Sequence, residues 1–330
     1  MTTVLGQQKA LSYLAKLAAT RKVAGAFLFF GPDGVGKKAA ALEFAKALNC
    51  QEETARQAGV ACGCCPSCIS IDKGTHPDVT LVDFIYQARL ELKKTVSPKD
   101  YDEELEKILA KQQHLSVSTI REVTAKSQQK SATDGWKVLI IDQAQTMQGA
   151  AANALLKFIE EPPAKTVWIL ITNKRFAMLR TILSRCQPLA FAPLSQDIVR
   201  QILTERELAV EDIEKAAKYS GGSVTGALAA DKAISFLRES QFGTALGPMS
   251  VAGGLSHTAV VARQEAQAVL DVLIQALYQA WITKNSVGQT KLQPLLKRFE
   301  TYKRSITRNV SPALVLETAL MSLDGIDLSL

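Results

Sequence analysis

The segment that most constrains this chain is a glycine-rich turn between an apolar run and a helical pattern. The apolar residues 26–30 predict a buried strand, and residues 37–48 predict the helix that follows the turn. Strand, glycine turn and helix is the order of a P-loop, whose backbone N–H groups cradle phosphates. The spacing assigns this role to Gly31, Gly34, Gly36, Lys37 and Lys38. The chain is therefore expected to contain an α/β nucleotide-binding core with a parallel sheet.

Two positions depart from a working nucleotide site. Lys38 stands where a Ser or Thr hydroxyl would complete the Mg²⁺ shell, and an ammonium cannot ligate a metal. The apolar run 138–141 ends in Asp142, as in a Walker B strand whose aspartate supports magnesium. Gln143 follows where a catalytic glutamate would polarise water, and an amide cannot serve as general base. These departures predict at most weak nucleotide binding, with ATP and Mg²⁺ not consumed.

Further patterns divide the chain into a core and a helical remainder. Short β-rich runs at 79–83, 136–142, 167–172 and 189–191 alternate with helical patterns, as in a parallel sheet. The charged stretch 87–113 predicts an exposed insertion with a helix over about residues 99–111, and 243–254 predicts a glycine-rich loop. The strand pattern ends after Pro193. Three domains are predicted: a core at 1–192, a small helical lid at 193–231 and a helical collar at 232–330.

Five of the six cysteines lie between positions 50 and 68, a clustering that favours metal binding over a disulfide framework. Cys62, Cys65 and Cys68 form two Cys-x-x-Cys steps, and Cys50 ends the helix after the P-loop. Four thiolates at this spacing can close a tetrahedral structural Zn²⁺ site with no open coordination position. The adjacent Cys64 and Cys65 cannot easily both join it. The alternative is a cluster of free thiols.

Charge and apolar patterning bear on location and partners. The net charge of +7 suits a protein beside nucleic acid, although scattered surface lysines and arginines are the commoner cause of so modest an excess. The N-terminal residues show no signal-peptide pattern, and no apolar run approaches the ~20 residues that span a bilayer. A cytoplasmic protein without membrane contact is expected.

Several motifs together resemble one family, the delta-prime subunits of the bacterial DNA polymerase III clamp loader, within the AAA+ superfamily. The resemblance covers nearly the whole length. It is carried by residues 4–7, the P-loop, the cysteine cluster, residues 153–157 leading to 160–163, and residues 183–186. The family spacing favours Cys65 over Cys64 as the zinc ligand. It also implies that Arg185, with Ser184 and Cys186 of its motif, lies at a subunit boundary and reaches ATP of the neighbouring subunit as an arginine finger.

The resemblance implies a non-hydrolysing subunit of a hetero-oligomeric ring with gamma or tau and delta. This ring loads the sliding clamp on primed DNA during replication, in a cytoplasmic replisome at the nucleoid. The hydrolysing relatives carry Lys-Thr in the P-loop, Asp-Glu in Walker B and an arginine after Gly-Gly-Ser, where this chain has Thr225. Thr172 and Asn173 fall in a second nucleotide-sensing region of the family, and the alternative is that they are ordinary polar residues at the end of a strand. Two alternatives stay open: an active ATPase of the gamma or tau type, and a zinc-dependent nucleic-acid-binding module.

Overall fold

The computed structural model describes residues 4–92, 101–240, 247–256, 258–283, 286–306 and 310–323. The chain divides into two compact units, Met1–Ala192 and Pro193–Leu330. Across the described residues, no helix combines the length and the apolar character that crossing a membrane would require.

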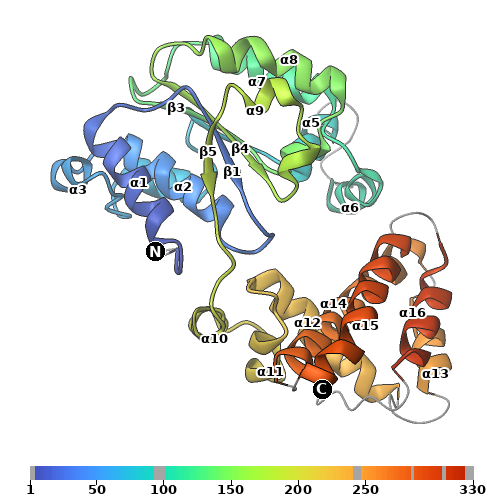
Figure 1. Ribbon diagram of the computed structural model, residues 1–330. Helices are drawn as coiled ribbons and strands as arrows, with labels where there is room; N and C mark the ends of the chain where they lie inside the picture. The colour runs from blue at the N-terminus through green and yellow to red at the C-terminus, as the bar shows by residue number, and fades with distance from the viewer. Residues whose placement is uncertain are drawn as a thin grey trace. The chain divides into compact units, whose positions relative to one another are not determined.

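The first unit is built on a parallel sheet of five strands in the order β2-β3-β4-β1-β5 (Figure 1). The strands are β1 (Ala26–Phe30), β2 (Val79–Val82), β3 (Lys137–Ile141), β4 (Thr166–Thr172) and β5 (Gln187–Ala190). Strands β3 and β4 are buried at every position, as expected of parallel strands covered on both faces. The predicted α/β core with a parallel sheet is confirmed.

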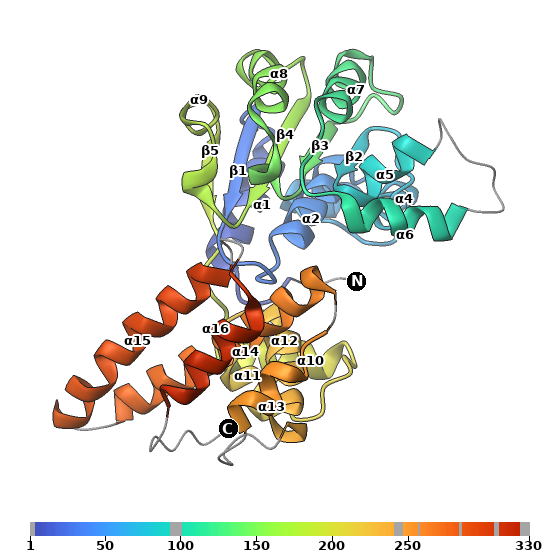
Figure 2. The same cartoon turned by 90° about the vertical axis from the view of Figure 1, so that its right-hand side faces the viewer.

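Helices cover both faces of this sheet (Figures 1 and 2). One face carries α1 (Gln8–Thr20) and α2 (Lys37–Asn49), and the other carries α7 (Val117–Gln128), α8 (Gly149–Glu160) and α9 (Arg180–Leu183). Alternate residues of β1 serve the two faces: Leu28 belongs to the core shared with α7 and α8. The Phe27 ring instead packs on Phe44 of α2, with centroids 5.9 Å apart. Single 3₁₀ turns occur at Ala144–Thr146 and Arg175–Ala177.

Gln7 connects the start of the chain to two distant segments. Its Nε2 donates to the carbonyl of Val35 in the P-loop at 3.2 Å and to that of Ala192 at 2.8 Å. Its Oε1 accepts from the N–H of Ala192 at 3.2 Å. The side chain is 4% exposed, so each of these polar atoms is satisfied inside the protein. Gln7 therefore holds the P-loop and the last residue of the first unit together.

Among the described residues between α2 and α7 are the helices α3 (Glu53–Ala58), α4 (Pro66–Asp72), α5 (Phe84–Leu92) and α6 (Tyr101–Lys111). The prediction of an exposed insertion from residue 87 was wrong at its start. Gln87 is buried; its Nε2 donates to the carbonyl of His114 at 3.1 Å and its Oε1 accepts from the N–H of Ser116 at 2.7 Å. This amide fixes the return of the chain into α7. Of the predicted insertion helix, α6 is described and residues 99 and 100 lie outside the described residues.

The described part of the second unit is helical, as the fold class predicted. Its helices are α10 (Gln196–Glu205), α11 (Ile213–Lys218), α12 (Val224–Glu239), α13 (Gly247–Gly253), α14 (Ala259–Thr283), α15 (Ser286–Ile306) and α16 (Pro312–Met321). Their core includes Leu270, Leu273 and Leu277 of α14 with Phe299 of α15 and Leu316 of α16. Helix α12 runs through residues 231 and 232, where the lid was predicted to end. The division into lid and collar stays a prediction.

The loop predicted at 243–254 contains the helix α13. Val251 is fully buried in the core of the second unit, and Ala252 is 8% exposed. Burial of these side chains offsets the low helix propensity of the flanking glycines. The prediction of a loop took account of that propensity but not of the burial. Residues 241–246 lie outside the described residues.

Candidate functional site

The predicted nucleotide motifs meet at the carboxyl edge of the sheet, where parallel α/β folds bind ligands. The P-loop follows β1, and Asp142 follows β3. Asp83, which the sequence reasoning did not single out, follows β2. Because Val82 of β2 pairs with Ile141 of β3, the two aspartates come next at the same level of neighbouring strands.

Lys37 is bound by the P-loop's own backbone. Its Nζ donates to the carbonyl of Gly31 at 2.7 Å and to that of Pro32, and lies 3.7 Å from a carboxylate oxygen of Asp33. Burial lowers the pKa of Lys37, and this effect outweighs the nearby carboxylates. A phosphate would have to replace these carbonyl contacts to recruit the lysine.

Lys38 lies between the two aspartates. Its Nζ is 3.0 Å from Oδ2 of Asp83 and 3.3 Å from Oδ2 of Asp142. The carboxylates are 18% and 19% exposed, whereas the lysine is 43% exposed. Burial acts to lower the pKa of Lys38, but Asp83 and Asp142 together raise it by more than burial lowers it. The net shift of the pKa is therefore upward, and the amine is held protonated. The residue that removes a magnesium ligand thus also places a cation at the carboxylates.

The polar residues around this edge bind protein groups. Gln143 has a left-handed backbone (φ 51°), and its N–H donates to Oδ1 of Asp142 at 2.9 Å. The Asn173 amide donates to the carboxylate of Asp33 in the P-loop. The Thr172 hydroxyl accepts from the N–H of Lys174 at 3.0 Å. In the second unit, Thr225 is exposed on α12. No general base stands beside Asp142 in the position that Gln143 occupies.

Four cysteines converge next to α2, and they are the four that the sequence reasoning chose. The sulfurs of Cys50, Cys62, Cys65 and Cys68 all lie within 4.8 Å of one another. Cys50 follows the last residue of α2, and Cys65 is the N-cap of α4. Cys64 is exposed and is not one of this group. Zn–S bonds of about 2.3 Å in a tetrahedron put sulfurs about 3.8 Å apart, which these positions can meet with small shifts.

The surroundings of the cysteines suit a bound cation. The N–H of Cys65 donates to Sγ of Cys62 at 3.3 Å, and the N–H of Cys68 donates to Sγ of Cys65 at 3.4 Å. The backbone N–H groups of Cys64 and Cys65 lower the pKa of Cys62 to about 6, which favours the thiolate that a metal needs. Burial raises the pKa of Cys50 and of Cys68, two thiols that a cation would deprotonate. The donor set fits a closed structural metal site.

His76 supports the cysteine segment from outside. Its Nδ1 accepts from the N–H of Asp78 at 3.1 Å, so Nε2 carries the proton and faces the Ser67 hydroxyl at 3.2 Å. Burial lowers the pKa of His76 and keeps the ring neutral. Both ring nitrogens thus contact protein groups of the turn between α4 and β2. Ser67 lies between two of the converging cysteines, so the ring fixes their backbone.

Arg185 follows α9 and is 38% exposed. Its Nε pairs with the carboxylate of Glu160 at the end of α8, and Nη1 donates to the carbonyl of Thr181 at 3.0 Å. Ser184 caps this arrangement, with its Oγ 3.3 Å from Nη1. Cys186 is buried in the core under the sheet, where burial raises the pKa of its thiol to about 12. The guanidinium is thus accessible and held at the surface, and the cysteine serves packing.

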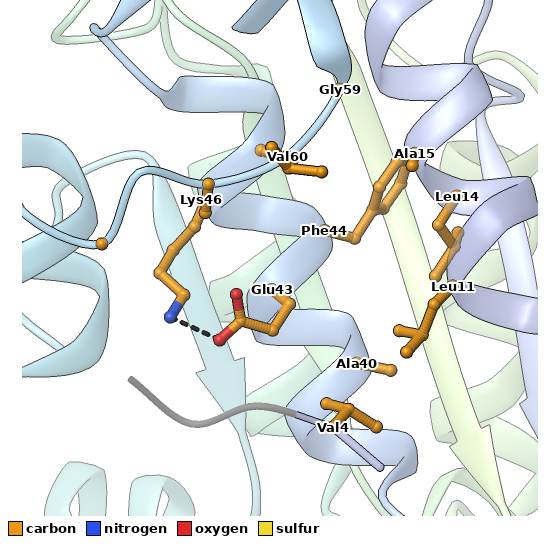
Figure 3. Close-up of a pocket in the computed structure, with 13 residues that line it drawn as sticks. Val4, Leu11, Leu14, Ala15, Ala40, Glu43, Phe44, Lys46, Gly59 and Val60 are labelled. Carbon is orange, nitrogen blue, oxygen red and sulfur yellow. Dashed lines mark ion pairs between the residues drawn. The ribbon is translucent and has the colours of Figure 1, made fainter. Parts of the chain in front are cut away.

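An apolar pocket of about 310 Å³ lies between α1, α2 and the loop that leads to the cysteines (Figure 3). Leu11, Leu14 and Phe44 line it. Its charged lining residues, Glu43 and Lys46, pair with each other at 2.5 Å. No titratable group of the described lining is left to act on a ligand, so the pocket adds no chemistry to the site.

Comparison with known protein families shows which family the chain belongs to. A family model described as "DNA polymerase III, delta subunit" matches residues 6–195, which include the P-loop, the cysteines and Arg185. The chain belongs to this family. Members of the family named DNA polymerase III subunit delta' are 33% identical in Pseudomonas aeruginosa, over 63% of this chain and 56% of that protein, and 34% identical in Bacillus subtilis, over 57% and 48%.

A differently named subunit of DNA polymerase III is also a relative. DNA polymerase III subunit tau of Bacillus subtilis is 32% identical over 71% of this chain and 37% of its own length. The matched parts therefore cover about half or less of the first curated relatives.

Proposed function

We propose that the chain is a non-hydrolysing subunit of the DNA polymerase III clamp loader. The observation that carries this proposal is the position of Lys38, whose ammonium lies 3.0 Å from Asp83 and 3.3 Å from Asp142. A magnesium ion bridging β- and γ-phosphates needs this place, and a water attacking the γ-phosphate needs a base where Gln143 stands. Both requirements for turnover are missing from this chain.

The contribution of such a subunit to the ring would be made in trans. Arg185 is exposed and permanently charged, and its partners among the described residues are protein groups that a phosphate can replace. In this proposal it stabilises charge at the γ-phosphate of ATP on an adjacent gamma or tau subunit. The ring, completed by delta, loads the sliding clamp onto primed DNA in the cytoplasm, at the nucleoid. A structural Zn²⁺ on Cys50, Cys62, Cys65 and Cys68 holds the segment after α2.

The match to tau favours one alternative, an active ATPase. A hydrolysis assay on the purified chain with Mg²⁺ and ATP separates the two. We expect no turnover above that of the Lys37→Ala variant. Steady turnover that Lys37→Ala abolishes would replace the silent subunit by the active one. Co-purification with gamma or tau and with delta tests ring membership, and failure to associate would favour an independent zinc-dependent nucleic-acid-binding module.

A further inference from the structure

We propose that the Lys38 ammonium substitutes for a divalent cation, and that a Mg²⁺ site between Asp83 and Asp142 becomes available only when this ammonium is removed. The inference rests on the silent nucleotide site of the proposed function, because both concern the same residues. It does not depend on the role of Arg185.

The two carboxylates are oriented for one shared cation. Oδ1 of Asp83 accepts from the N–H of Tyr86 at 2.9 Å, and Oδ1 of Asp142 accepts from the N–H of Gln143 at 2.9 Å. Each aspartate therefore has one oxygen fixed by backbone, and the other, Oδ2, lies against Nζ of Lys38. Since the aspartates follow paired residues of β2 and β3, the sheet holds this separation. The pair is a preformed cation-binding arrangement, and the lysine is its occupant.

Charge explains why the place must be filled. Two negatively charged carboxylates that are each less than one-fifth exposed repel each other, and a cation between them offsets this repulsion. The Lys38 side chain is 43% exposed, so the position is reachable by a hydrated ion. Mg²⁺ binds through one or two carboxylates while keeping several waters, which matches two oriented oxygens at an open edge. An ammonium tethered to α2 excludes that ion at any magnesium concentration.

The choice of variant follows from the P-loop position. Lys38→Thr removes the ammonium and adds a hydroxyl where nucleotide-binding loops carry their metal ligand. Lys38→Met removes the charge, keeps most of the aliphatic length and adds no oxygen. Lys37→Met is the matched control, because it removes the neighbouring ammonium and leaves Lys38 between the aspartates.

The test is thermal unfolding of the zinc-loaded full-length chain over a range of Mg²⁺ concentrations, without chelator. For the wild type and Lys37→Met we expect a melting temperature independent of Mg²⁺. For Lys38→Thr we expect a melting temperature several degrees lower without metal, rising with the logarithm of Mg²⁺ concentration. Lys38→Thr combined with Asp142→Asn should lose this rise. Binding of Mn²⁺, followed by the resonance of the free ion, should show the same order, with Lys38→Met weaker than Lys38→Thr.

Two results would overturn the inference. One is a wild-type melting temperature that rises with Mg²⁺ as steeply as that of Lys38→Thr. The other is folded Lys38→Thr that neither binds Mn²⁺ nor gains stability from Mg²⁺. A variant unfolded without metal is tested by adding Mg²⁺, and failure to refold counts against the inference. No readout involves ATP turnover, so a failed arginine finger leaves this test unaffected.

Discussion

Replacement of Arg185 by alanine should separate a catalytic contribution from a structural one. Arg185 and its partner Glu160 are 38% and 41% exposed, and exposed ion pairs contribute about 0.2–1 kcal/mol to stability. For a unit of the size of Met1–Ala192, which contains Arg185, about 1 kcal/mol corresponds to roughly 2–4 °C of melting temperature. The Arg185→Ala chain should therefore stay folded and melt within a few degrees of the wild type.

The expected effect on catalysis is far larger. An arginine supplied in trans to a phosphoryl-transfer site contributes about 10³–10⁵ in kcat. At 25 °C this range corresponds to about 4–7 kcal/mol of transition-state stabilisation. Turnover at the ATP site that adjoins this subunit should fall by at least about 10³-fold, with other sites of the ring unaffected directly. Because this loss of transition-state stabilisation is much larger than the change in folding stability, it would be assigned to the lost contact between Arg185 and the reacting phosphate.

The assay is ATP hydrolysis by the reconstituted complex, stimulated by clamp and primed DNA, after co-purification shows that the variant assembles. Arg180→Ala, at the start of the same helix α9, is the matched control and should behave as the wild type. Arg185→Lys keeps the charge but not the planar fork, so it should restore only part of the activity. Wild-type turnover in an assembled Arg185→Ala complex would refute the trans role.

Three other substitutions test separate parts of the structure. Cys65→Ser should lose bound zinc and destabilise the segment after α2, whereas Cys64→Ser should keep its metal; metal analysis and melting curves decide, and full zinc in Cys65→Ser would exclude that ligand. In Asp78, burial raises the pKa but hydrogen bonds from Thr133, Ala132 and Ser131 lower it by more. Its stabilisation is thus complete above about pH 4 and is lost as the pH falls through the lowered pKa. Asp78→Asn should cost about 1–3 kcal/mol at pH 7 and flatten the acid limb of urea unfolding, and an unchanged limb would contradict this. Glu160→Gln should release Arg185 and raise the affinity of the complex for ATP up to a few-fold, while an affinity below wild type would mean that Glu160 positions the guanidinium.

Local patterns were enough to place the elements that carry the site. The strand at 26–30, the helix that starts at Lys37 and the four converging cysteines all depend on short-range periodicity or spacing. The helix at 247–253 was missed because its stability comes from burying Val251 in a core formed by distant helices. The glycines and the proline in this stretch indicate a low helix propensity, but the local sequence does not show the stabilisation that comes from burying Val251.

The partners of the key charged residues could not be predicted in the same way. Asp83 is 45 residues from Lys38 in the sequence, and only the pairing of β2 with β3 brings it beside Asp142. Glu160 lies in a motif that the sequence had singled out, but its contact with Arg185 depends on how the ends of α8 and α9 pack. One signal was available for Asp83, an acidic residue directly after an apolar strand, as at Asp142.

The amide of Gln7 gives the P-loop a direct mechanical link to the end of the first unit. The Gln7 side chain hydrogen-bonds the backbone of Val35 and, through both its donor and its acceptor, the backbone of Ala192. Residue 192 is followed at once by Pro193, where the second unit begins. A backbone shift in the P-loop can therefore be transmitted to residue 192 through the Gln7 side chain alone, without a change in the strands. Gln7→Glu has the same shape but cannot donate to either carbonyl, so it would uncouple the P-loop from residue 192.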